Sequence, residues 1–131
     1  MGELITFHGK TDGSSTEGVF ELESDILHGT VSYIRIPKGM KAKIWAKRIG
    51  GTACDIIIEY THDITATDPW ASPVTIELES LSDAGELKTE KRRPIILRGF
   101  TGKEAFRAKW KQSTAAESHI ALEVEFDELS S

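Results

Sequence analysis

Apolar and polar residues alternate along most of the chain with the two-residue period of β-strands. The alternation is clearest near the C-terminus, where every second residue from 120 to 126 is apolar: Ile120, Leu122, Val124 and Phe126. Turn clusters rich in Gly, Pro, Ser and Asp separate such runs. The pattern predicts strands over 3–7, 18–23, 30–36, 40–49, 54–61, 73–81, 86–92, 94–100, 104–112 and 118–127.

Many short strands with turns at this spacing indicate an all-β fold. We expect a single-domain antiparallel β-sandwich over residues 1–131, jelly-roll-like, with about eight to ten strands. A chain of 131 residues is long enough to bury one core without disulfides or metals. The single cysteine, Cys54, lies in an apolar strand, and this position predicts a buried thiol.

The last two predicted strands, 104–112 and 118–127, are expected to form a hairpin. A turn centred near Ala115 would place Arg107 opposite Glu123, and Lys111 opposite His119. The first of these pairs would gain from opposite charge.

A tryptophan interrupts the polar row of the predicted strand 40–49. One row of this strand holds Met40, Ala42, Ile44 and Ala46, and the other holds Lys41, Lys43, Trp45 and Lys47. Such an aromatic residue is either covered or available to a partner. We expect a neighbouring subunit to cover at least half of Trp45, with the lysine stems packed beside it.

Charge is arranged in blocks that the net charge of −5 conceals. Residues 1–37, 38–53, 54–87, 88–111 and 112–131 carry net charges of −4, +5, −8, +7 and −5. Acidic strands beside basic ones in one sheet would neutralise each other. Alternatively, segregated basic and acidic surfaces would let subunits dock through complementary charge. The two explanations are compatible in part.

The docking explanation pairs basic segments 38–48 and 88–111 with acidic segments 54–87 and 112–131. It assigns an interface to seven residues: Trp45, Lys41, Lys43, Lys47, Arg107, Lys109 and Lys111.

Catalytic motifs are absent from the sequence, and the four histidines stand singly. We therefore expect no enzyme and no cofactor. His62, Asp63 and Asp68 could offer metal ligands, but their spacing matches no known calcium loop, so no metal site is predicted.

Glycan binding is the alternative function, with Trp45 or Trp70 as the platform and with Asp68 and His62 as polar partners. The absence of Asn and of a secretion signal disfavours it. Nucleic-acid binding by Trp45 among lysines is disfavoured by the acidic blocks. No apolar stretch is long enough for a membrane helix, so no membrane partner is expected.

Three segments follow one another as an I-P-x-G entry turn with a strand, a loop that ends in Trp, and a last hairpin in which aromatic and polar residues alternate. They are "IPKGMKAKIWAKRI", "CDIIIEYTHDITATDPW" and "LRGFTGKEAFRAKWKQSTAAESHIALEVEF". In this arrangement the chain resembles small β-sandwich accessory structural proteins of tailed phages and archaeal viruses, of the capsid decoration, neck, tail or turret type. The resemblance implies a non-enzymatic building block whose partner is another copy or another structural protein. It also implies a location in the virion, and otherwise we expect a cytoplasmic protein.

Overall fold

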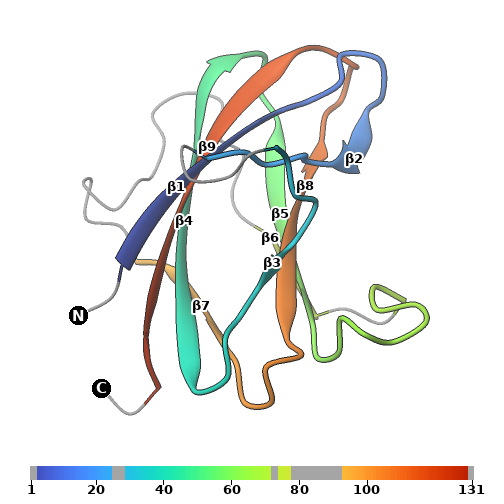
Figure 1. Cartoon of the computed structure of the whole chain (residues 1–131). Helices are drawn as coiled ribbons and strands as arrows, with labels where there is room; N and C mark the ends of the chain where they lie inside the picture. The colour runs from blue at the N-terminus through green and yellow to red at the C-terminus, as the bar shows by residue number, and fades with distance from the viewer. Residues whose placement is uncertain (1–2, 25–28, 72–73, 78–92, 130–131) are drawn as a thin grey trace.

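The computed structural model describes residues 3–24, 29–71, 74–77 and 93–129, and these residues build two β-sheets packed face to face (Figure 1). Within them no helix is present, and so none that could cross a membrane. The strands are β1 (Glu3–Lys10), β2 (Glu17–Val19), β3 (Ile34–Arg35), β4 (Met40–Gly51), β5 (Asp55–Thr61), β6 (Val74–Glu77), β7 (Ile95–Arg98), β8 (Ala105–Lys111) and β9 (Ser118–Glu128).

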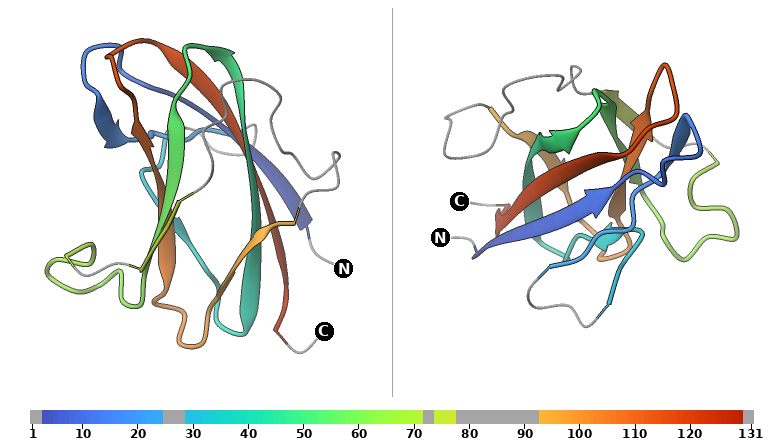
Figure 2. Two further views of the ribbon diagram at one scale, coloured as in Figure 1. Left: turned by 180° about the vertical axis from the view of Figure 1, so that it is seen from behind. Right: turned by 90° about the horizontal axis from the view of Figure 1, so that it is seen from above.

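The strand order is β1-β9-β4-β7 in one sheet, called sheet A here, and β2-β8-β5-β6 in the other, sheet B. The short β3 also pairs with β8, and every pair is antiparallel. Figure 2 shows the two layers from behind and from above. The predicted all-β sandwich is confirmed, and the jelly-roll-like arrangement stays a prediction. The predicted strand 86–92 lies outside the described residues.

The core lies between the sheets, and most of its side chains come from the inward rows of the long strands β4, β5, β8 and β9. Ala42, Ile44 and Ala46 of β4 face inward, and β8 contributes Phe106 and Trp110. Removing these apolar side chains from water is the main force that holds the sheets together.

Cys54 is buried, as the sequence predicts. Burial raises the pKa of its thiol, because a low-dielectric environment disfavours the thiolate.

The predicted hairpin of the last two strands is wrong, because β8 and β9 belong to different sheets. Arg107 therefore lies opposite Glu59 of β5 rather than Glu123. The residues between β8 and β9 cross from sheet B to sheet A, and buried polar contacts hold this crossing. The Thr11 hydroxyl donates to the Ala116 carbonyl at 2.6 Å and accepts from the Ser118 N–H at 2.8 Å.

Candidate interaction site

The seven predicted interface residues fall on opposite outer faces of the sandwich. Lys41, Lys43, Trp45 and Lys47 alternate with the inward row of β4 and so lie on the outer face of sheet A. Arg107, Lys109 and Lys111 alternate with the inward row of β8, on the outer face of sheet B. The core separates the two groups, so they do not form one surface.

The expectation that a neighbouring subunit covers at least half of Trp45 is wrong, because the chain itself already covers this residue. Only 7% of the residue is accessible to solvent in a single chain, so no neighbouring subunit is needed to cover it. The adjacent acidic row of β9 is nearly buried as well, including Glu123 directly opposite Trp45. The chain itself therefore excludes water from this part of sheet A.

The charges on the outer face of sheet A are paired within the chain. Lys43 Nζ lies 2.9 Å from the Asp127 carboxylate, which is two residues along β9 from Glu125, the residue directly opposite Lys43. This contact raises the pKa of Lys43 and lowers the pKa of Asp127. Basic β4 and acidic β9 thus neutralise each other as adjacent strands.

The outer face of sheet B shows the same pairing. Glu59 of β5 is only 6% exposed, and Arg107 Nε donates to its carboxylate at 2.8 Å. Lys109 Nζ lies 3.8 Å from the same oxygen. A nearly buried carboxylate needs such partners to offset its desolvation. These contacts support the cross-strand explanation of the charge blocks.

The residues of the predicted glycan site do not converge. Trp70 packs over Arg107, with the guanidinium carbon 4.4 Å from the ring centroid, so it lies on sheet B, opposite Trp45. His62 lies edge-on to Tyr60 at 4.9 Å between ring centroids. Asp68 is exposed in the loop that follows β5. Trp70 therefore closes over the sheet, and no aromatic platform shared with Trp45 is formed.

The most exposed large apolar side chain among the described residues is Phe100, at 63%. It lies in the loop between β7 and β8, at the lower end of the sandwich in Figure 1. A buried carboxylate, Glu104, organises this loop: it accepts the N–H groups of Phe100, Thr101 and Gly102 at 2.9, 3.1 and 3.1 Å. The loop therefore presents Phe100 in a defined position.

The Glu104 carboxylate is charged in this setting. Burial alone would raise its pKa, but the N–H donors of Phe100 and Thr101 and the Thr101 hydroxyl outweigh burial and lower the pKa. Hydrogen bonds to the charged form of an acid favour that form. The ionised carboxylate thus stabilises the loop.

Basic side chains surround the Phe100 loop. Arg35 Nε donates to the Gly102 carbonyl at 2.7 Å, and Lys103 follows Gly102 in the chain. The Cβ of Lys38 would lie 3.4 Å from a Cβ placed on Gly102. We call Phe100, Arg35, Lys38 and Lys103 the Phe100 tip.

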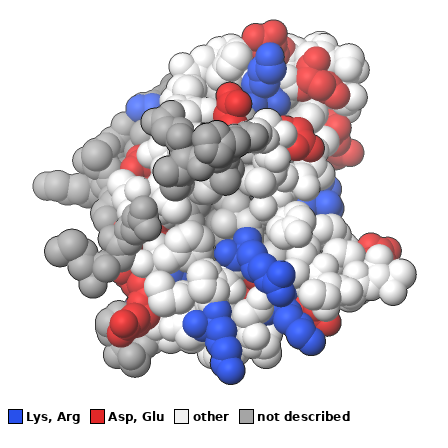
Figure 3. All heavy atoms as spheres, in the orientation of Figure 1, with Lys and Arg blue, Asp and Glu red and all other residues white. Residues whose placement is uncertain are grey.

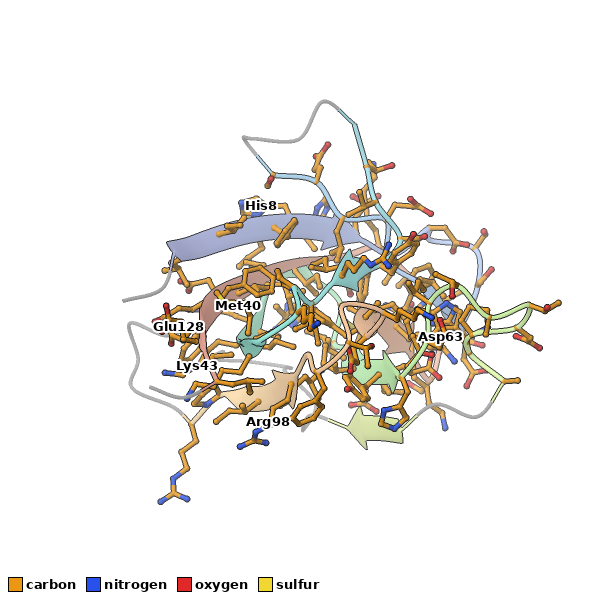
Figure 4. The ribbon with its side chains drawn as sticks, turned by 60° about the horizontal axis from the view of Figure 1, so that its bottom comes forward. His8, Met40, Lys43, Asp63, Arg98 and Glu128 are labelled. Atoms are coloured by element: carbon orange, nitrogen blue, oxygen red, sulfur yellow. The ribbon has the colours of Figure 1, made fainter. Side chains whose placement is uncertain are left out.

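Besides Glu104 in the loop itself, Asp63 is an acidic residue close to this tip, and Glu128 of β9 lies opposite Met40, beside the turn that carries Lys38. Bonds from Thr65 and then the charges of Lys103 and Arg35 lower the pKa of Asp63. Figure 4 brings this end forward and shows Asp63 on the loop after β5 and Arg98 projecting from β7. The basic side chains of Arg35, Lys38 and Lys103 are exposed at this tip, whereas the Glu104 carboxylate is buried.

The tip is tied to the turn before β4 through Gly99. Its N–H donates to the Met40 carbonyl and its own carbonyl accepts from the Gly39 N–H, both at 2.8 Å. A Cβ on Gly99 would lie 2.6 Å from the Pro37 carbonyl oxygen, so only glycine allows this approach. Lys38 and Phe100 are therefore held at a fixed separation.

A second surface feature is a groove of about 660 Å³ beside the C-terminal half of β1. We call it the β1 groove; its lining includes His8, Lys10, Glu21, Glu23, Trp110 and His119. Two of the four histidines, which stand singly in the sequence, thus meet here because β1 pairs with β9. The His119 ring contacts the Glu117 carboxylate at 2.8 Å. In the part of the chain that the structure describes, no group of three or more His, Cys, Asp or Glu residues is placed to hold a metal ion.

Neither the tip nor the groove is among the sites predicted from the sequence. The alternation assigns Phe100 to a strand, 94–100, whereas β7 ends at Arg98. The glycines on either side of "FT" in "RGFTGKE" are the signal that marks an aromatic residue in a turn. The groove has no such signal, because distant segments build it.

No protein-family model matches the chain, and no curated protein matches it. Among solved structures, the chain is similar to part of one described as "Glycosylation Associate Protein (Gap123) complex from Streptococcus agalactiae". The sequence identity is 14%, the TM-score is 0.37 and 92% of this chain is covered. This chain spans 26% of the length of that chain. A similarity of this size carries no argument about function.

Proposed function

We propose that this protein is a non-enzymatic assembly module whose copies associate through the Phe100 tip. The observation that carries the proposal is a largely exposed aromatic ring on a loop fixed by a buried carboxylate and flanked by Arg35, Lys38 and Lys103. Aromatic and Arg side chains are enriched in protein interfaces. A loop already held in one conformation loses little entropy on binding.

The proposed contact differs from the one expected from the sequence. Trp45 is covered within one chain, and Lys43 and Arg107 are paired there, so we assign the association surface to the tip instead. An accessory role in a virion, which the sequence resemblance implies, is one setting for such an assembly and belongs to the same proposal.

The test is the mass in solution, measured by light scattering on a sizing column over a concentration series. At low salt the wild-type chain should exceed its monomer mass of 14.5 kDa, and about 0.5 M salt should loosen the association by screening the tip charges. The Phe100→Ala variant should stay at 14.5 kDa.

Ile49→Ala is the matched control, since Ile49 is also an exposed apolar side chain, at 51%, near the other end of β4. It should associate like the wild type. A wild-type chain that is monomeric at every concentration and salt, or a Phe100→Ala variant that associates normally, would overturn the proposal.

A further inference from the structure

We infer that the Phe100 tip of one copy docks into the β1 groove of a second copy, so that the chains associate head to tail. This inference rests on the proposed function, because it names the surface that receives the tip.

The groove and the tip carry opposite charge. Three carboxylates line the groove, those of Asp12, Glu21 and Glu23, against one lysine, Lys10. The tip has the opposite excess, with its three basic side chains around Phe100. In Figure 3 basic side chains gather low on the face in view, and acidic ones are more numerous near its top. Opposite potentials on two surfaces favour their encounter.

The groove also has an apolar part that suits an aromatic ring. Val19 and Trp110 line it, beside the backbone of Gly9. Its volume of about 660 Å³ lies in the range of pockets that bury small ligands, so one phenylalanine ring and the ends of its basic neighbours fit. An aromatic anchor in a pocket with charged residues at its rim is a usual form of a binding hot spot.

The alternative contact, tip against tip around a two-fold axis, would place like charges together. The basic side chains of Arg35, Lys38 and Lys103 would then lie against the basic side chains of the partner's tip. Repulsion between these like charges disfavours binding. The tip and the groove are separate surfaces: Figure 4 shows His8 of the groove on the opposite side of the molecule from Arg98, which is near the tip. One copy can therefore use both at once, and the assembly grows into a ring or an open filament.

The test uses two variants that each lose one surface. Phe100→Ala removes the tip and keeps the groove. The double variant Glu21→Lys with Glu23→Lys reverses the groove charge and keeps the tip, and neither position is buried. Each variant alone should stay at 14.5 kDa, with association weakened more than about tenfold. An equimolar mixture should form a complex of two chains that does not grow further, because it has one working tip and one working groove.

A second double variant, Asp68→Lys with Glu17→Lys, changes the net charge equally at exposed positions that neither line the groove nor belong to the tip, and it should associate like the wild type. Circular dichroism melts confirm that every variant is folded.

The outcomes separate the two proposals. If Phe100→Ala is monomeric while the groove variant associates like the wild type, the tip functions but docks elsewhere, and the head-to-tail inference is wrong. A mixture of folded variants that stays monomeric also contradicts the inference. If Phe100→Ala associates like the wild type, the proposed function itself fails.

Discussion

Trp45 and Phe100 occupy contrasting places in this sandwich. Trp45 belongs to the polar row of a long strand, yet it is 7% exposed. Phe100 follows a short apolar strand in the sequence, yet it is 63% exposed. The alternation of a strand tells which face a side chain occupies, whereas its exposure depends on what the rest of the chain places over that face.

The same contrast separates the charges around the two aromatic residues. Next to Trp45, Lys43 is bound to Asp127 of the neighbouring strand. Around Phe100, three basic side chains are exposed, while the nearest carboxylate, that of Glu104, is buried and bound within the loop. A charged row in a sheet is neutralised by its neighbours, while an end of the sandwich can keep an excess of one sign. The difference favours association surfaces at the ends of the strands.

The largest effect is expected at Trp45. Trp45→Ala should lower the free energy of unfolding by about 3–5 kcal/mol, because it removes a large buried aromatic ring and leaves a cavity. Denaturant unfolding at one protein concentration measures this loss. Association should fall only as far as the folded fraction falls.

Ile96→Ala is the control for Trp45→Ala, since Ile96 lies on the same outer face and is 40% exposed. Ile96→Ala should lower the free energy of unfolding much less than Trp45→Ala does. If Trp45→Ala kept the wild-type stability and lost association, Trp45 would be an interface residue after all.

The next largest effect is expected at the base of the tip. Glu104→Gln should lower the free energy of unfolding by about 1–3 kcal/mol. The loop N–H groups donate to both oxygens of the carboxylate, whereas an amide has only one oxygen that accepts hydrogen bonds. It should also weaken association, because the Phe100 loop loses its fixed position. Denaturant unfolding and light scattering measure the two effects.

The pH dependence gives a further readout for Glu104. The folded-state pKa of Glu104 is lowered, so its stabilisation is present above the unfolded-state pKa and is lost as the pH falls through the folded-state pKa. The stability difference between wild type and Glu104→Gln should thus begin to narrow as the pH falls through the ordinary titration range of a glutamate and should narrow further at lower pH. A difference independent of pH would mean that the ionised carboxylate does not hold the loop.

The sequence predicts which face of a strand is buried better than it predicts which strands pair with each other. The inward rows of β4 and β8 follow directly from the alternation, as does the buried Cys54. The partner of Arg107 does not follow from the alternation. Either acidic strand, 54–61 or 118–127, could place a carboxylate opposite Arg107, and a hairpin is the simplest way to pair strands that are consecutive in the chain. The crossing instead depends on buried polar contacts of Thr11 with Ala116 and Ser118.

The candidate site is still less predictable from the sequence. The tip joins residues from the β3–β4 turn and the β7–β8 loop, such as Lys38 and Phe100, which are far apart in the chain. The groove likewise joins β1 with residues 19–23 and with Trp110. The alternation of apolar and polar residues along a strand does not show which distant loops lie side by side in the fold.

A smaller effect is expected for Trp70, the other aromatic residue on an outer face. A double-mutant cycle of Trp70→Leu and Arg107→Met should give a coupling free energy of about 0.5–1 kcal/mol, the size of a cation–π contact at a partly exposed site. The cycle is needed because Arg107→Met alone also leaves Glu59 without its closest partner. A coupling free energy of zero, with a stable Trp70→Leu variant, would mean that the contact with Arg107 does not hold Trp70. The ring would then be available to bind a glycan.

The smallest effect on folding is expected at Phe100. Phe100→Ala should change the free energy of unfolding by less than about 0.5 kcal/mol, because most of the ring is already in water and the Glu104 bonds go to the backbone. Denaturant unfolding at a concentration where both chains are monomeric makes the comparison direct. A loss near ~2 kcal/mol would make Phe100 a structural residue like Trp45, and its effect on association would then reflect folding. An unchanged stability together with lost association would instead assign the ring to contact between copies.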